Sequence, residues 1–245
     1  MTQKSNPQDQ TLSIAAPVGF EAQAVPIHEL CTGQPKVATH ILTPLSLRER
    51  FQNPPVWQPE ITDESRHVVA ADIISKRQAA GKVTRAAVLI PLLLNSDGLS
   101  VLLTQRTDHL HDHAGQISFP GGRMDPGDSD PNETALRESE EEIGLNRQSV
   151  EIIGHLPQYL TVSGYSVTPV VGLVKPQAEY VLDAFEVADV FEVPLHFLMD
   201  PENHQVRAWE SDQGSRRFYS MPYENRFIWG ATAGMLRNLY HLLKV

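Results

Sequence analysis

The carboxylates of Glu138, Glu141 and Glu142 are the side chains whose types and spacing most clearly indicate chemistry in this sequence. Positions three and four apart lie on one face of a helix, so the three acids face the same way if their segment is helical. Like charges at that spacing repel each other by roughly 0.2–0.5 kcal/mol per pair. A hard divalent cation among them explains the arrangement, and oxygen ligands suit Mg²⁺ or Mn²⁺. We therefore predict a metal site here, with Glu138 and Glu142 as its first ligands.

Two roles fit Glu141, and the sequence does not separate them: it is a third metal ligand or the general base. The simplest alternative for all three acids is a helix face that only contacts water. Such a face has no need of Arg137 beside it, of Gly144 and Leu145 after it, or of the Phe-Pro-Gly-Gly stretch at 119–122. These features together favour the metal site.

The residues around the acids predict where their helix begins and ends. Asp130, Pro131 and Glu133 fit an N-cap, a first-turn proline and a capping-box glutamate, and Gly144 fits a left-handed C-terminal residue. Glu133 and Glu140 fall outside the face of the three acids and should point to water. The adjoining face should pack on a sheet, and it consists of Ala135, Leu136, Ser139 and Ile143.

Residues 119–122 and 137–145 together resemble the box of the Nudix hydrolases, which has the pattern Arg-Glu-x-x-Glu-Glu-x-Gly followed by an apolar residue. The stretch between the glycines and the arginine is one residue longer than the commonest form of the box. Its usual mid-loop glutamate is best matched by Asp128 or Asp125. The resemblance implies a metal-dependent attack of water on a phosphorus of a pyrophosphate linked to a nucleoside.

Further segments look like the coenzyme A pyrophosphatase branch of that family. They are 102–106, 113–116 leading into 119–122, 161–165, 186–188 with 194–195, and 228–233, and the likeness extends over roughly 46 to 245. It implies coenzyme A or a derivative as substrate, with 3′,5′-adenosine bisphosphate and 4′-phosphopantetheine as products. The rival readings are another nucleoside diphosphate derivative, such as ADP-ribose or a nucleotide sugar, and a non-catalytic Nudix module that only binds its ligand.

Arginines near the box are the other predicted participants. We expect Arg137 to pair with Glu133 and Glu141 along the helix and to orient Glu141. Arg106 and Arg123 flank the glycine turn and are candidates for contacts with the phosphates of the substrate.

The glycine turn and a histidine-rich stretch complete the predicted substrate site. Gly121 and Gly122 should allow the chain to pass close to the metal site. His113 falls where the coenzyme A branch has a histidine, whereas His111 stands in place of that branch's arginine. Alternating His109, His111 and His113 would suit zinc if the stretch were a strand, but neighbouring polar residues favour a loop.

Composition excludes several classes of protein. The net charge of −10 argues against nucleic acid as the main partner. The single cysteine, Cys31, argues against disulfides and thiolate chemistry. The first residues lack a signal-peptide core, and the longest apolar run, 86–94, is about half a membrane span. We expect a cytoplasmic protein that does not enter a membrane, and a homodimer, which is common in related folds.

The chain divides into three predicted parts: a proline-rich flexible extension at 1–45, a helical segment at 46–84 that packs on the catalytic domain, and the Nudix hydrolase domain at 85–245. Short helices are expected at 46–51 and 65–80, and a last helix at 231–243. Strands are expected at 86–94, 99–104, 151–155, 167–174, 206–210 and 217–219, the first two joined by a hairpin turn at 95–98. Alternating strands and helices indicate an α/β fold. The resemblance specifies an α/β/α sandwich with a mixed β-sheet.

Overall fold

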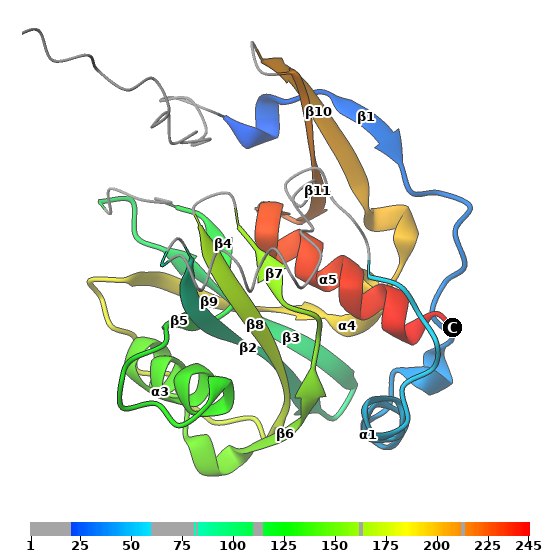
Figure 1. Ribbon diagram of the computed structural model, residues 1–245. Coiled ribbons are helices and arrows are strands. Elements are labelled where there is room, and N and C mark those ends of the chain that lie inside the picture. The colour runs from blue at the N-terminus through cyan, green and yellow to red at the C-terminus, as the bar shows by residue number, and fades with distance from the viewer. Residues whose placement is uncertain (1–20, 60–80, 82, 110–114, 162–163, 212–213) are drawn as a thin grey trace, which may run out of the picture.

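A computed structural model describes residues 21–59, 81, 83–109, 115–161, 164–211 and 214–245 of the chain. Within them it forms an eight-stranded main sheet and a four-stranded second sheet (Figure 1). The strands are β1 (Ile27–Leu30), β2 (Thr84–Asn95), β3 (Gly98–Arg106), β4 (Ile117–Ser118), β5 (Gly121–Arg123), β6 (Val150–His155), β7 (Tyr159–Leu160), β8 (Tyr165–Val174), β9 (Val187–Pro194), β10 (Gln205–Ser211), β11 (Gly214–Tyr223) and β12 (Arg226–Trp229). The α-helices are α1 (Pro44–Gln52), α3 (Pro131–Ile143), α4 (Leu195–Leu198) and α5 (Gly230–Leu243). Short 3₁₀ helices are η1 (Ala22–Ala24), η2 (Thr39–Ile41), η4 (Arg147–Ser149) and η5 (Pro201–Asn203).

The centre of the main sheet is β2, which has neighbours of both directions. It pairs antiparallel with β3 through the predicted hairpin, where Asn95 faces Gly98, and parallel with β8 along ten residue pairs. Gly98 has a φ of 130°, which only glycine adopts easily. The predicted hairpin and mixed sheet are both confirmed.

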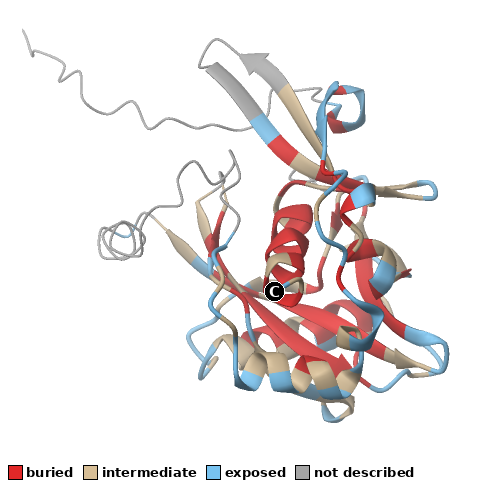
Figure 2. Ribbon diagram, turned by 90° about the vertical axis from the view of Figure 1, so that its right-hand side faces the viewer, coloured by how far each residue is buried: buried red, intermediate tan, exposed pale blue. Residues whose placement is uncertain are grey.

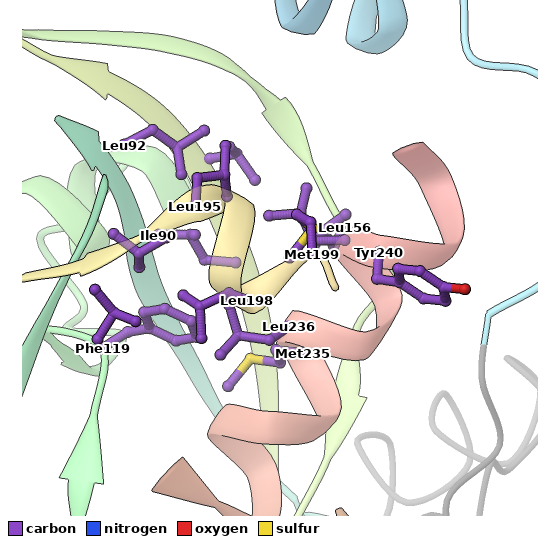
Figure 3. Packing of buried hydrophobic residues seen from close by; sticks show 14 of the residues in the cluster. Ile90, Leu92, Phe119, Leu156, Leu195, Leu198, Met199, Met235, Leu236 and Tyr240 are labelled. Atoms are coloured by element: carbon purple, nitrogen blue, oxygen red, sulfur yellow. The ribbon is translucent and has the colours of Figure 1, made fainter. Parts of the chain in front are cut away.

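Two hydrophobic clusters cover the two faces of this sheet, and β2 supplies both because its side chains alternate. Ile90 and Leu92 belong to the cluster beneath α4 and α5, and Leu89 and Leu93 belong to the cluster beneath α3. Figure 3 shows the first cluster, in which Leu236 of α5 joins Ile90 and Leu92. Strands β2, β3 and β8 and helix α5 are largely buried, whereas α3 exposes part of its surface (Figure 2). The predicted α/β/α sandwich is confirmed.

The second sheet has the order β1-β10-β11-β12 and contains part of the N-terminal segment. Strand β1 pairs with β10, so that Leu30 faces Gln205. Ala22 and Val25 are buried against Phe218 of β11.

This packing corrects one prediction: a flexible extension does not describe residues 21–45. They have no regular apolar period because the strand that they contribute pairs with a distant one, and few of their side chains are buried. Residues 1–20 lie outside the described residues.

Helix α1 contains the helix expected at 46–51 and packs on the main sheet beside β6. Arg48 forms a bidentate ion pair with Glu151, in which both N–O distances are 2.7 Å. The helix expected at 65–80 lies outside the described residues. Across the part of the chain that is described, no helix is both long and apolar enough to span a membrane.

Candidate active site

Helix α3 begins and ends where the sequence predicts. The side chain of Asp130 accepts hydrogen bonds from the backbone N–H groups of Asn132 and Glu133, and Pro131 is the first helical residue. Gly144 follows the helix with a φ of 64°, and its N–H donates to the Glu140 carbonyl. These caps satisfy backbone groups that would otherwise lack partners at the helix ends. They fix the helix and therefore the direction in which its acids point.

Glu142 lies at the bottom of the site and is only 6% exposed. Its Oε2 atom accepts a hydrogen bond of 3.1 Å from the Gly121 N–H, which holds the carboxylate against the glycine turn. Burial above all, together with the negative charges of Glu138 and Glu186, raises the pKa of Glu142 to about 8 against the opposing effect of the Gly121 N–H. The fold thus places a carboxylate where ionisation is unfavourable unless positive charge is brought to it.

Glu138 lies one helical turn before Glu142 and faces the same glycine turn. Burial raises its pKa, although the Arg137 guanidinium, 3.0 Å away, acts in the opposite direction. A Cβ atom added to Gly122 would lie 2.5 Å from the Glu138 carboxyl carbon, and one added to Gly121 would lie 2.4 Å from the Ala87 carbonyl oxygen. The backbone of β2 leaves no room for a side chain at Gly121, and glycine at position 122 leaves the Glu138 carboxylate in place.

Glu141 lies at the outer rim of the site, and its side chain is 60% exposed. Its carboxylate binds Arg137 at 2.9 Å, as the sequence predicts. The predicted pair of Arg137 with Glu133 is not formed. Arg137 instead binds both carboxylate oxygens of Asp128 at 2.9 Å and donates to the Arg123 carbonyl at 3.1 Å.

Of the two candidates for the mid-loop acid, Asp128 is the one that binds Arg137, whereas Asp125 is exposed. The Arg137 guanidinium holds the pKa of Asp128 well below its usual range. Asp128 also accepts hydrogen bonds from the Thr134 hydroxyl and the Asp125 N–H, both at 2.9 Å. The loop before α3 is thereby fixed to the arginine that binds Glu141.

The acids on the solvent side of α3 have a different partner. Arg147 binds Glu133 through Nη1 and Glu140 through Nε, each at 2.9 Å. The reciprocal half of the predicted capping box is absent because Glu133 turns to this arginine instead of to the Asp130 N–H. The two acids thus share one positive charge at the surface.

Glu186 is a fourth acid at the site that the sequence analysis did not single out. Its charge raises the pKa of both Glu138 and Glu142, and its Oε2 atom lies 3.9 Å from Nη1 of Arg106. The only signal for it was the short segment at 186–188. Arg106 is thereby placed at the edge of the acid group, whereas Arg123 is exposed on β5.

The histidine-rich stretch is described only in part. His109 is exposed, and its ring contacts Phe185 edge to face with centroids 5.0 Å apart. His111 and His113 lie outside the described residues, so the assignment of His113 to the substrate and the zinc alternative both stay predictions.

The acid group fits a hard divalent cation in its chemistry, because every donor is a carboxylate oxygen and burial disfavours the ionised form of two of them. In the described ranges no three histidine, cysteine or acidic side chains already stand close enough together to hold a metal ion. Glu138 and Glu142 are the residues that would hold one, with Glu141 and Glu186 beside them.

Comparison with known proteins gives one clear result. Residues 83–214 match a family model described as the NUDIX domain. An uncharacterized Nudix hydrolase, NudL, of Yersinia pestis (strain Pestoides F) is 43% identical over 155 residues, which cover 63% of this chain and 77% of the relative. A solved Ap4A hydrolase of C. elegans is 22% identical over 45% of this chain and 80% of its own, with a TM-score of 0.40. A MutT/nudix family protein of Enterococcus faecalis is 15% identical over 82% of this chain and 73% of its own, with a TM-score of 0.41.

Proposed function

This chain belongs to the Nudix family, and we propose that it is a metal-dependent hydrolase of the pyrophosphate bond of coenzyme A or its derivatives. The products would be 3′,5′-adenosine bisphosphate and 4′-phosphopantetheine. The observation that carries the proposal is the pair of Glu138 and Glu142, one helical turn apart and half-buried or buried against β5, where Gly121 and Gly122 leave room for them. An acid pair so placed is unfavourable for stability and is explained by a cation.

A bound Mg²⁺ or Mn²⁺ ion would neutralise non-bridging phosphate oxygens and lower the pKa of the attacking water. The chain's own part is positioning. The Gly121 N–H fixes Glu142, and Arg137 fixes Glu141 at the solvent-facing rim. At that rim Glu141 serves as general base or as a further ligand. We assign contacts with the phosphates to Arg106 and Arg123.

The choice of coenzyme A depends on the segments that resemble the coenzyme A pyrophosphatase branch, including 102–106 and 186–188. ADP-ribose or a nucleotide sugar is the second candidate, because the same acid group suits any nucleoside diphosphate derivative. A module that only binds its ligand is disfavoured because the acid trio is intact and Arg137 is held in place by Asp128.

Three further assignments belong to the proposal. A chain whose single cysteine, Cys31, is buried suits a reducing compartment, and we propose the cytoplasm. We also propose a homodimer, which sedimentation of the purified protein would test. We assign it no nucleic-acid or membrane partner, given the net charge of −10 and the absence of a membrane-spanning helix from the described residues.

Product analysis tests the function directly. The full-length protein would be incubated with coenzyme A, ADP-ribose and nucleoside triphosphates, each with Mg²⁺ or Mn²⁺, in ¹⁸O-labelled water. We expect coenzyme A to be cleaved with the highest kcat/KM and the label to appear in one of the two named products. Faster cleavage of ADP-ribose would make ADP-ribose the assigned substrate instead of coenzyme A. If none of these compounds is cleaved, the assignment of enzyme activity is refuted.

A further inference from the structure

Phe185 is an exposed aromatic side chain next in sequence to an acid of the active site. It is 64% exposed, whereas Phe119 and Phe218 are buried. Among the large apolar side chains that are exposed in the described ranges, it is the one aromatic residue. Its neighbour Glu186 acts electrostatically on both Glu138 and Glu142. The ring therefore stands one residue away from the group that would hold the pyrophosphate.

The turn that carries Phe185 is fixed from both sides. On the side of α3, the Asp183 N–H donates to the Glu142 carbonyl at 2.9 Å, and the Asp183 carboxylate accepts from the Phe185 N–H at 2.9 Å. On the side of β3, the Thr107 hydroxyl donates to the Phe185 carbonyl at 2.8 Å and the Thr107 N–H donates to the Glu186 carbonyl at 3.0 Å. The backbone that carries the exposed ring is thus held in a set position relative to the acids.

His109 adds a second ring beside the first. The two ring centroids are 5.0 Å apart and the ring planes meet at 61°. Such a pair forms a corner: a planar ligand can lie on the face of Phe185 while the imidazole of His109 meets its edge. This corner faces solvent, since both residues are exposed.

We propose that Phe185 and His109 form the platform on which the base of the nucleotide substrate stacks, with adenine as the base. The proposal rests on the function proposed above and adds how the site recognises the nucleoside. The surroundings favour a base over an apolar protein partner, because the residues near the two rings in sequence include the acids Asp108, Asp183 and Glu186. A neutral aromatic base has a π-face that needs no apolar surroundings, and stacking on an aromatic side chain stabilises the bound base whatever its sequence context.

The test compares two ligands that differ only by the base, AMP and ribose 5-phosphate, with the full-length protein. We expect calorimetry to show that AMP binds tighter by on the order of 10-fold, and NMR to show upfield shifts of the adenine H2 and H8 signals from the phenyl ring. Phe185→Ala should abolish both the preference and the shifts, and Phe185→Trp should keep them. Val181→Ala is the matched control, because Val181 is an exposed apolar residue of the same loop.

The outcomes separate this proposal from the function itself. If Phe185→Ala keeps the preference for AMP, or if the unmodified protein has none, the platform is refuted even when coenzyme A is cleaved. If no pyrophosphate is cleaved but the preference exists and disappears in Phe185→Ala, the enzyme assignment fails and the platform stands. A change of oligomeric state in Phe185→Ala with an unchanged preference would assign the ring to an interface between copies and refute the platform.

Discussion

The two sides of helix α3 carry the same residue type in opposite circumstances. Glu133 and Glu140 lie at the surface, and one arginine, Arg147, binds both at 2.9 Å. Glu138 and Glu142 lie against the glycine turn, and burial raises the pKa of each. The helix propensity of the four is the same, so the difference arises only from what the fold places opposite each side.

The difference shows how counter-charge is distributed. On the solvent side two acids share Arg147. On the inner side Arg137 is shared among Asp128, Glu138 and Glu141, and Glu142 receives the Gly121 N–H. The inner side therefore keeps an excess of negative charge, which is a cost in stability for the protein alone and an advantage for binding a cation.

The largest effect should come from removing one inner charge. Glu138→Gln or Glu142→Gln keeps the side-chain size, and we expect turnover to fall by on the order of 10² or more because electrostatic stabilisation is lost. Steady-state kinetics at sub-saturating Mg²⁺ would measure this, with circular dichroism as a check of folding. Full activity in either variant would refute the assignment of that residue as a ligand.

A smaller effect on turnover should follow from displacing the Glu138 carboxylate. A Cβ atom at Gly122 would lie 2.5 Å from the Glu138 carboxyl carbon, so Gly122→Ala must displace that carboxylate. We expect turnover to fall by on the order of 10-fold, as for a catalytic group that is misplaced by about 1 Å. Gly127→Ala is the control, because nothing lies within 4 Å of the added atom. Equal kinetics for the two variants would contradict the close approach.

The buried carboxyl group of Glu142 should also make the free energy of unfolding depend on pH when a chelator removes metal ions. Glu142 has a pKa of about 8 in the folded protein and an ordinary value of 4.5. Between these values the folded protein binds the proton that the unfolded chain has released. This contribution to the free energy of unfolding is complete below pH 4.5 and is lost as the pH rises through 8.

Thermal unfolding in a chelator measures this effect. We expect a loss of a few kcal/mol at most between pH 5 and pH 9, the scale set by about 1.4 kcal/mol per pKa unit. Glu142→Gln should flatten the profile and be the more stable protein at pH 9. Parallel profiles for the two proteins would show that Glu142 does not titrate in this range.

Removing the ion pair between Asp128 and Arg137 should have an effect of intermediate size. Asp128→Asn removes the charge that binds two nitrogens of Arg137, and we expect about 1–3 kcal/mol lower stability and a turnover reduced several-fold through loss of order at Glu141. Urea unfolding and kinetics would measure the two effects. Asp125→Asn is the matched control on the same loop, and it should change neither by much.

The smallest effect should be on the solvent side. Glu140→Gln removes one partner of Arg147 at an exposed position, where an ion pair contributes about 0–1 kcal/mol. Turnover should be unchanged in the assay used for Glu142→Gln. A loss of turnover as large as that of Glu142→Gln would mean that the acids on the two sides of the helix do not differ in their importance for catalysis.

Features encoded within a few residues could be predicted from the sequence. The ends of α3 depend on Asp130, Pro131 and Gly144, and the β2–β3 hairpin depends on the turn at 95–98. That Glu138 and Glu142 face the same way follows from helical geometry alone. Each of these needs only local information.

Features that depend on distant partners could not be predicted. The pairing of β1 with β10 and the burial of Ala22 and Val25 depend on residues beyond position 200. The partners of Arg137 and Arg147 depend on the path of the loops before and after α3, and several spacings would have suited either arginine equally well. Glu186 joins the acids only because the turn at 183–186 is bonded to the end of that helix.

The parallel pairing of β2 with β8 bears on how the protein folds. Thr84 pairs with Tyr165, so β3, the glycine turn and the whole of α3 lie within the loop that this pairing closes. Closing a long loop is slow, whereas the capped α3 and the β2–β3 hairpin involve only nearby residues and form quickly. We expect the inner acids to be brought together only after the rate-limiting step. A cation bound by them should then slow unfolding without speeding folding, since it stabilises contacts that the transition state lacks.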